Sequence, residues 1–363
     1  MPIRPAVRSL PAYHFRPHEH RVKLDQNECP WDLPEALRAR ALARLSSTPL
    51  QRYPDMHAER VRAAIAAYEG WPEHGVVVAP GSNVLIQAAV IAAGLERRVL
   101  SVTPSFSLYA LQAQLLGVEL RLVPLGDGFA LPLEALRSEL AAGEGVHFLA
   151  APMAPTGNAV EAADVRALAR AGEGRWLTVI DEAYGVFAGS DHSSVAREVS
   201  GAVSLRTFSK AFGMAGVRLG YALTEPAVAL HLQKVLLPFA VSAAQSALAE
   251  TVLEDPSFVE ERVALLRSER ERVQTALSAR AGIEAFPSVT NFVLFRVDDA
   301  AATFAGLAAR GVLVRRQDHL QGLENCLRVS VGEREENDAF LAALDDHLAA
   351  PGETPKGEPH AHA

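Results

Sequence analysis

Residues 177–184 read Leu-Thr-Val-Ile-Asp-Glu-Ala-Tyr, in which an apolar or β-branched run of four residues is followed by two acids. A short run of this kind between polar boundaries is typical of a buried strand. The segments around it, such as residues 162–171, have apolar residues spaced near the helical period. Repeated strand–helix order predicts an α/β large domain, in which helices cover both faces of a mostly parallel sheet. Similar runs occur at Val76–Val78, Val99–Val102, His147–Ala150 and Ala202–Leu205.

The chain on either side of this region has a different texture. Residues 226–280 are dense in Ala, Leu, Glu and Arg and predict long helices, and residues 291–297 and 326–331 alternate as strands do. This pattern predicts a small α+β C-terminal domain. An N-terminal arm would carry one helix over residues 34–45. We therefore expect an arm and part of the small domain at 1–50, the large domain at 51–240, the small domain at 241–350 and a disordered tail at 351–363.

The composition favours an intracellular protein with a large core. The 363 residues are 49% hydrophobic and carry a formal net charge of −8, which disfavours a general nucleic-acid binder. Two cysteines, Cys29 and Cys326, are too few for a disulfide framework or, alone, for a zinc site. We find no apolar run that could span a bilayer and no apolar signal-peptide core near the first residue. The cytoplasm is the expected location, with no metal and no membrane partner.

Polar residues follow several of the predicted strands. Ligands collect at the carboxyl ends of the strands in such sheets. After the first strand, Gly81 would allow close backbone approach, and Ser82 would begin a helix whose N–H groups suit a phosphate. Asp181 ends the fourth strand, and Lys210 and Arg218 follow the fifth. Each alone is compatible with a helix cap or a surface side chain, but together they supply what pyridoxal phosphate needs.

Five longer motifs carry a resemblance to a known family. The chain resembles the fold-type I pyridoxal-phosphate-dependent aminotransferases and, within them, the histidinol-phosphate aminotransferases. The serine–lysine block within Arg206–Phe212 is highly specific for this cofactor, whereas Leu24–Pro30 and Arg52–Pro54 are moderately specific for the histidinol-phosphate branch. The motifs are Leu24–Pro30, Arg52–Pro54, Asp181–Tyr184, Arg206–Phe212 and Cys326–Gly332.

The resemblance implies roles for individual residues. Lys210 would bind pyridoxal 5'-phosphate as an imine and later shuttle a proton, Asp181 would pair with the pyridine nitrogen, and Tyr184 would donate to the phenolic oxygen. Phe106 would stack on the cofactor ring, where the family usually has Tyr. The phosphate would be bound by Ser82, Asn83, Ser209 and Arg218, with Tyr53 reaching in from a neighbouring subunit. The substrate would be bound by Arg328, with Arg315, Tyr13 and Asn27 nearby.

Two positions depart from the family pattern. The family usually reads Pro-Asn-Asn-Pro-Thr-Gly where this chain has Pro152-Met153-Ala154-Pro155-Thr156-Gly157. Ala154 therefore stands where an Asn normally donates to the phenolic oxygen, and alanine has no side-chain donor. Asn158 lies beyond the glycine and is no obvious substitute. Val84 replaces a frequent Glu.

The resemblance also implies an activity and partners. We expect a homodimer that transfers an amino group from a small-molecule donor to a 2-oxo acid, with histidinol phosphate and 2-oxoglutarate as the pair. Aminotransferases of aromatic or other amino acids, a threonine-phosphate decarboxylase and a non-catalytic cofactor-binding homologue are the alternatives. Only the last is favoured by Ala154.

Overall fold

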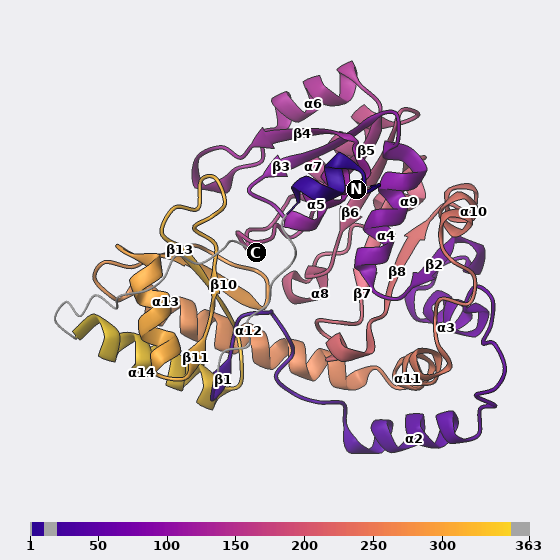
Figure 1. Ribbon diagram of the computed structural model, residues 1–363. Coiled ribbons are helices and arrows are strands. Elements are labelled where there is room, and N and C mark those ends of the chain that lie inside the picture. Colours follow the sequence, from indigo (N-terminus) through magenta and orange to yellow (C-terminus); the bar gives the residue numbers. More distant parts are fainter. Residues whose placement is uncertain (1, 11–19, 350–363) are drawn as a thin grey trace.

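The computed structural model of the protein describes residues 2–10 and 20–349 (Figure 1). Tyr13 and the predicted tail at 351–363 lie outside these residues. Within the described part, no helix is both long and apolar enough to cross a membrane.

A seven-stranded sheet forms the centre of the large domain (Figure 1). Its order is β2-β8-β7-β6-β5-β3-β4, and β8 is the one strand that runs antiparallel to its neighbours. The predicted mostly parallel sheet is confirmed. The strands are β2 (Val76–Ala79), β3 (Arg98–Thr103), β4 (Glu119–Pro124), β5 (Gly145–Ala150), β6 (Trp176–Asp181), β7 (Ala202–Thr207) and β8 (Gly220–Thr224).

Successive side chains along the strands of the sheet pack alternately into two separate hydrophobic cores, one on each face. Leu149 and Ile180 belong to one core, while Phe148 and Val179 belong to the other. Because successive strand residues point to opposite faces, apolar runs bury both faces only when helices cover both. One face is covered by α4 (Ser82–Ala89), α5 (Ser107–Leu116) and α10 (Pro226–Val235). The other is covered by α3 (Glu59–Glu69), α6 (Leu133–Ala142), α7 (Ala162–Gly172), α9 (Ser193–Glu198) and α11 (Ala243–Glu254).

The small domain has its own sheet and its own core. Its four strands have the order β12-β13-β10-β9 and are antiparallel. A third apolar cluster lies among this sheet, α13 and α14. The elements are β9 (Glu284–Ala285), β10 (Phe292–Arg296), α13 (Ala300–Ala309), β12 (Arg315–Arg316), β13 (Cys326–Ser330) and α14 (Arg334–Ala349).

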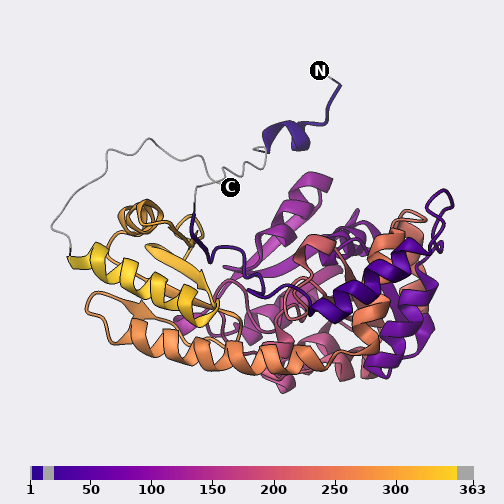
Figure 2. The same cartoon turned by 90° about the horizontal axis from the view of Figure 1, so that it is seen from below.

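Several segments connect the domains. The long helix α12 (Ser257–Ser278) contacts α14, β9 and β10 of the small domain and also α8 (Gly185–Ala188) of the large domain. It is the long orange helix that runs beneath both domains in Figure 2. Strand β1 (Val22–Lys23) pairs with β11 (Val312–Leu313). Helix α2 (Glu35–Ser46) packs on α11, and α1 (Pro5–Ser9) packs on α5. The domain limits at 50, 240 and 350 stay a prediction.

Candidate functional site

The site lies at the carboxyl edge of the large sheet. Asp181 is the last residue of β6, Lys210 lies three residues beyond β7, and Ser82 begins α4 just after β2. Strands β2, β6 and β7 run in the same direction, so their carboxyl ends meet at one edge. Residues that are up to 128 positions apart in sequence thereby face one region.

Asp181 is held as a buried acceptor. Its side chain is 8% exposed and accepts hydrogen bonds from Tyr109 OH at 2.7 Å and from the Ala183 N–H at 3.1 Å. Burial raises the pKa of Asp181, while the bond from Tyr109 and the nearby charge of Lys210 lower it. A pyridinium placed beside this carboxylate would favour its ionised form further.

Tyr109 is a site residue that the sequence reasoning did not single out. It is 1% exposed and stacks on Phe148 at 4.7 Å between ring centroids. Burial, with Asp181 beside it, raises the pKa of Tyr109 well above its usual value, so the phenol stays protonated and donates. In the sequence, only its position three residues after Phe106, the residue expected to stack on the cofactor ring, could have pointed to it.

Lys210 has the environment of a reactive amine. Its Nζ donates to the Gln26 carbonyl at 2.8 Å and lies 5.7 Å from the ring centre of Tyr184. Burial lowers the pKa of Lys210, opposed by Tyr184 and reinforced by the positive charge of Arg328. A lysine with a lowered pKa is deprotonated more often and becomes a better nucleophile.

Tyr184 lies between the two domains. Its hydroxyl accepts a hydrogen bond from Asn27 Nδ2 at 2.8 Å, and its ring meets Phe292 edge-on at 5.1 Å. The structure thus brings Tyr184 together with Lys210 and Asn27. Sequence reasoning placed Asn27 near the substrate but did not foresee this contact.

An anion cradle stands beside Lys210. Gly81 has a φ of +92°, and a side chain there would approach Arg218 Nη2 to 3.0 Å. Arg218 Nη1 donates to Ser209 Oγ at 3.3 Å, and the first turn of α4 begins at Ser82. A guanidinium, two hydroxyls and a helix N-terminus with no Cβ in the way fit a phosphate group. Asn83 is exposed on the same turn.

Two predicted aromatic residues lie at the margin. Phe106 is 36% exposed and meets Tyr109 edge-on at 5.5 Å, so it flanks the ring that reaches Asp181. Tyr53 is 82% exposed, and its ring stacks on Phe239 of its own chain at 4.8 Å.

Two arginines lie on the small-domain side. Arg328 and Arg315 are direct partners on β13 and β12. Arg328 Nη2 donates to the Asp25 carbonyl at 2.9 Å, while its buried Nε has no hydrogen-bond partner among the described residues. Burial lowers the pKa of Arg328, as does the adjacent Arg315. Like charges directly opposite each other are unfavourable, so this pair suits an anionic ligand.

Ala154 lies in a tight turn whose polar groups are used internally. It is buried, and the turn is closed by bonds from Gly157 N to Met153 O and from Met153 N to Asn158 O. The side chain of Asn158 accepts from Thr156 and reaches the Phe129 carbonyl at 3.4 Å. Asn158 is therefore committed elsewhere, in agreement with the sequence interpretation.

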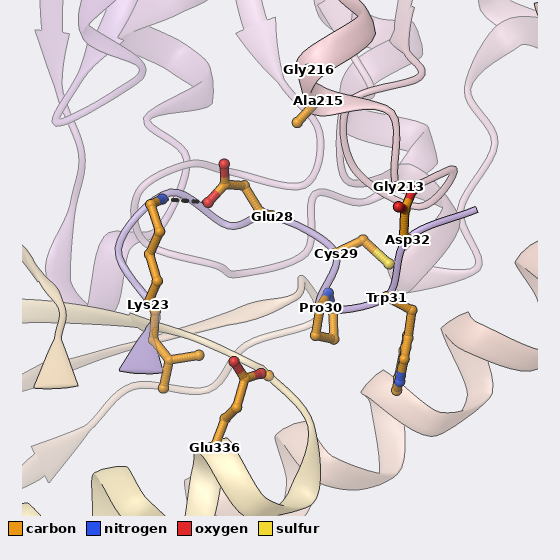
Figure 3. A pocket seen from close by; sticks show the side chains of 12 residues that line it. Lys23, Glu28, Cys29, Pro30, Trp31, Asp32, Gly213, Ala215, Gly216 and Glu336 are labelled. Atoms are coloured by element: carbon orange, nitrogen blue, oxygen red, sulfur yellow. Dashed lines mark hydrogen bonds and ion pairs between the residues drawn. The ribbon is translucent and has the colours of Figure 1, made fainter. Parts of the chain in front are cut away.

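A cleft of about 310 Å³ marks the seam between the domains (Figure 3). It is lined by Lys23, Glu28 and Trp31 from the N-terminal segment, by Glu336 of α14, and by Gly213, Ala215 and Gly216. Lys23 and Glu28, which both lie on the N-terminal segment, form an ion pair in this lining (Figure 3). Its lining includes neither Lys210 nor Asp181, so the cleft lies beside the candidate site. Within residues 2–10 and 20–349, no group of His, Cys, Asp or Glu is arranged to hold a metal ion.

Comparisons with known proteins agree with this geometry. Residues 19–344 match the sequence model of the family described as Aminotransferase class I and II. A histidinol-phosphate aminotransferase from Deinococcus radiodurans is 47% identical over 94% of this chain and 95% of the relative. Histidinol-phosphate aminotransferase 2 from Cupriavidus pinatubonensis is 39% identical over 95% of this chain and 97% of the relative.

Solved structures show the same fold. One is the crystal structure of histidinol-phosphate aminotransferase from Sinorhizobium meliloti in complex with pyridoxal-5'-phosphate. It has a TM-score of 0.85 and 24% identity and covers 96% of this chain and 97% of that one. The crystal structure of the histidinol-phosphate aminotransferase from Clostridium acetobutylicum has a TM-score of 0.84 and 22% identity. It covers 90% of this chain and 98% of that one. The predicted fold class is confirmed.

Proposed function

The chain belongs to the class I and II aminotransferase family, and on that premise we propose that it transfers an amino group between histidinol phosphate and 2-oxoglutarate through pyridoxal phosphate. One observation carries the proposal. A buried carboxylate, a lysine of lowered pKa, a phenol and an anion cradle meet at a single sheet edge. The 47% identity to a histidinol-phosphate aminotransferase supports the choice of substrate.

Asp181, Tyr184 and Lys210 would hold the reacting end of the cofactor. When bound, pyridoxal phosphate supplies an electron sink for the electron pair left behind as the substrate loses a proton from Cα. Asp181 would keep a proton on the ring nitrogen, and Tyr184 would donate to the phenolic oxygen. Lys210 would hold the cofactor covalently and, once released, would take the substrate Cα proton on Nζ and return it to the cofactor carbon C4′.

The remaining predicted residues would bind the two ends of the reactants. Ser82, Asn83, Ser209 and Arg218 would bind the cofactor phosphate at the start of α4, and Phe106 would cover the ring. Arg328, with Arg315, would bind an anionic group of the substrate. Support for this comes from the unpartnered Nε of Arg328, which an oxygen of a carboxylate or phosphate would satisfy.

The active assembly would be a homodimer in the cytoplasm. Tyr53 is 82% exposed and stacks on Phe239. Other exposed apolar side chains lie close in sequence: Leu50 and Met56 near Tyr53, and Leu237 near Phe239. An exposed apolar surface of this kind favours contact with a second copy, which would carry Tyr53 to the partner's phosphate site. The cytoplasm is supported by the two free cysteines, Cys29 and Cys326.

Chemical trapping tests the cofactor site. The chain has only four lysines, Lys23, Lys210, Lys234 and Lys356. We expect borohydride reduction of the cofactor-loaded protein, followed by peptide mapping, to place the label on Lys210. Lys210→Ala should lose the label and nearly all turnover, whereas Lys234→Ala, an exposed lysine on α10, serves as the matched control. A label on Lys23 or Lys234 would overturn the assignment.

A further inference from the structure

The segment Leu24–Asn27 ties the small domain to the candidate site. The Leu24 carbonyl accepts from the backbone of Ser330, and the Asn27 carbonyl accepts from Asn291 Nδ2 at 3.1 Å. On its other side, the Gln26 carbonyl accepts from Lys210. The segment therefore has a fixed position between the two domains.

Asn27 has a fixed orientation within this segment. It is 1% exposed, with a φ of +53°, and its backbone N–H donates to Ser330 Oγ at 2.8 Å. Because the Ser330 hydroxyl accepts there, its one proton is available for Asn27 Oδ1, which lies 3.1 Å away. With Oδ1 turned toward Ser330, the amide nitrogen faces Tyr184.

The amide nitrogen sets the direction of the Tyr184 hydrogen. Nδ2 has only hydrogens to offer, so the Tyr184 oxygen, 2.8 Å away, acts as the acceptor in this contact. The phenol keeps its own proton for another acceptor. Hydrogen bonds in a chain polarise one another, so a phenol that accepts one bond donates a stronger one.

We propose that Asn27 is a positioning residue that aims and strengthens the hydrogen bond from Tyr184 to the phenolic oxygen of pyridoxal phosphate. This inference rests on the proposed function. It gives Asn27 a different role from the substrate contact expected from the sequence, because its backbone N–H and C=O and both polar atoms of its side chain have protein partners. The relay from Ser330 through Asn27 to Tyr184 would strengthen the remaining hydrogen bond to the phenolic oxygen. It would thereby offset part of the hydrogen bond that Ala154, which has no side-chain donor, does not supply.

A pH titration of the visible absorbance of the cofactor-loaded protein tests the relay. Asn27→Gly removes the amide and keeps a residue that tolerates the positive φ. A weaker bond from Tyr184 would leave more negative charge on the phenolic oxygen, which would hold the adjacent proton more tightly. We expect the spectroscopic pKa to rise by about half a unit to one unit.

The same change in a Tyr184→Phe background separates positioning from general structure. With the phenol gone, Asn27→Gly should shift the spectroscopic pKa by much less than it does in the wild-type chain. Ser330→Ala, which frees the amide without removing it, should give a smaller rise and carries the test if Asn27→Gly does not fold.

Two outcomes would overturn the inference: equal shifts in both backgrounds, or a chromophore on Lys210 whose pKa does not respond to either Asn27→Gly or Ser330→Ala. A protein that forms no chromophore on Lys210 would instead contradict the proposed function.

Discussion

At the residue scale, the charge of Asp181 is the property on which the site depends. Its two oxygens accept from Tyr109 and from the Ala183 N–H, and no other carboxylate is among the causes that shift its pKa. Asn has the same shape and can still accept one of these bonds, but it has no charge to keep a ring nitrogen protonated. The substitution therefore separates charge from geometry.

We expect Asp181→Asn to lower turnover by about 10²–10³-fold, the usual cost of losing one preorganised electrostatic contact. Steady-state rates at saturating cofactor measure this, with folding checked by the denaturant midpoint. Near-normal turnover would mean that Asp181 serves only to cap the turn at Ala183.

Ala154 is the second residue with a predicted effect. An Asn at this position would add a donor to the phenolic oxygen, draw negative charge from it and weaken its hold on the adjacent proton. A bond to a charged group is worth roughly 1.5–3 kcal/mol, so a fall of about one unit in the spectroscopic pKa is expected for Ala154→Asn. Absorbance titration of both proteins decides, and a pKa that stays the same or rises would show that another group already serves this oxygen.

At the element scale, the sequence predicted five strands of the seven-stranded sheet and missed two, β4 and β8. Strand β4 lies at the edge of the sheet, and its charged Glu119 and Arg121 break the apolar run used to recognise a strand. Strand β8 is buried but begins two residues after Arg218 and runs antiparallel, outside the repeated strand–helix order.

The contacts of the site were harder to predict than its residues. Lys210, Asp181 and Arg218 could be selected because each follows a predicted strand. The bonds from Tyr109 to Asp181 and from Asn27 to Tyr184 join residues 72 and 157 positions apart. Such contacts depend on helix orientation and on the path of an irregular segment, neither of which periodicity reveals.

Strand β5 contains a histidine that should make stability depend on pH. His147 is opposite Thr178 in the ladder, and neither ring nitrogen has a partner among the described residues. Burial lowers the pKa of His147 from 6.5 to about 4. The unfolded chain therefore binds this proton more readily than the folded protein does.

The contribution of neutral His147 to the free energy of unfolding is therefore fully present above pH 6.5. It is lost as the pH falls from 6.5 toward 4, by about 3 kcal/mol in total. We expect His147→Leu to flatten this part of the profile of unfolding free energy against pH. Denaturant titrations of both proteins between pH 7 and 4.5, at equal cofactor saturation, measure it. Parallel profiles would contradict the buried, neutral state of His147.

At the scale of the whole molecule, the proposed dimer gives each site residues from two chains. If Tyr53 completes the partner's site, Tyr53→Ala and Lys210→Ala should each have little activity alone. An equal mixture under subunit exchange should recover about a quarter of the wild-type activity, since half of the dimers are mixed and each mixed dimer has one intact site. A fully active monomer in light scattering would exclude this arrangement.

The identity of the amino donor is the central claim, and the absorbance of the bound cofactor tests it most directly. Histidinol phosphate should remove the visible band of the loaded protein within one turnover, and 2-oxoglutarate should restore it. Phenylalanine and threonine phosphate, at equal concentration, should act far more slowly. A band that persists with histidinol phosphate but is lost with either of the other two compounds would contradict the account.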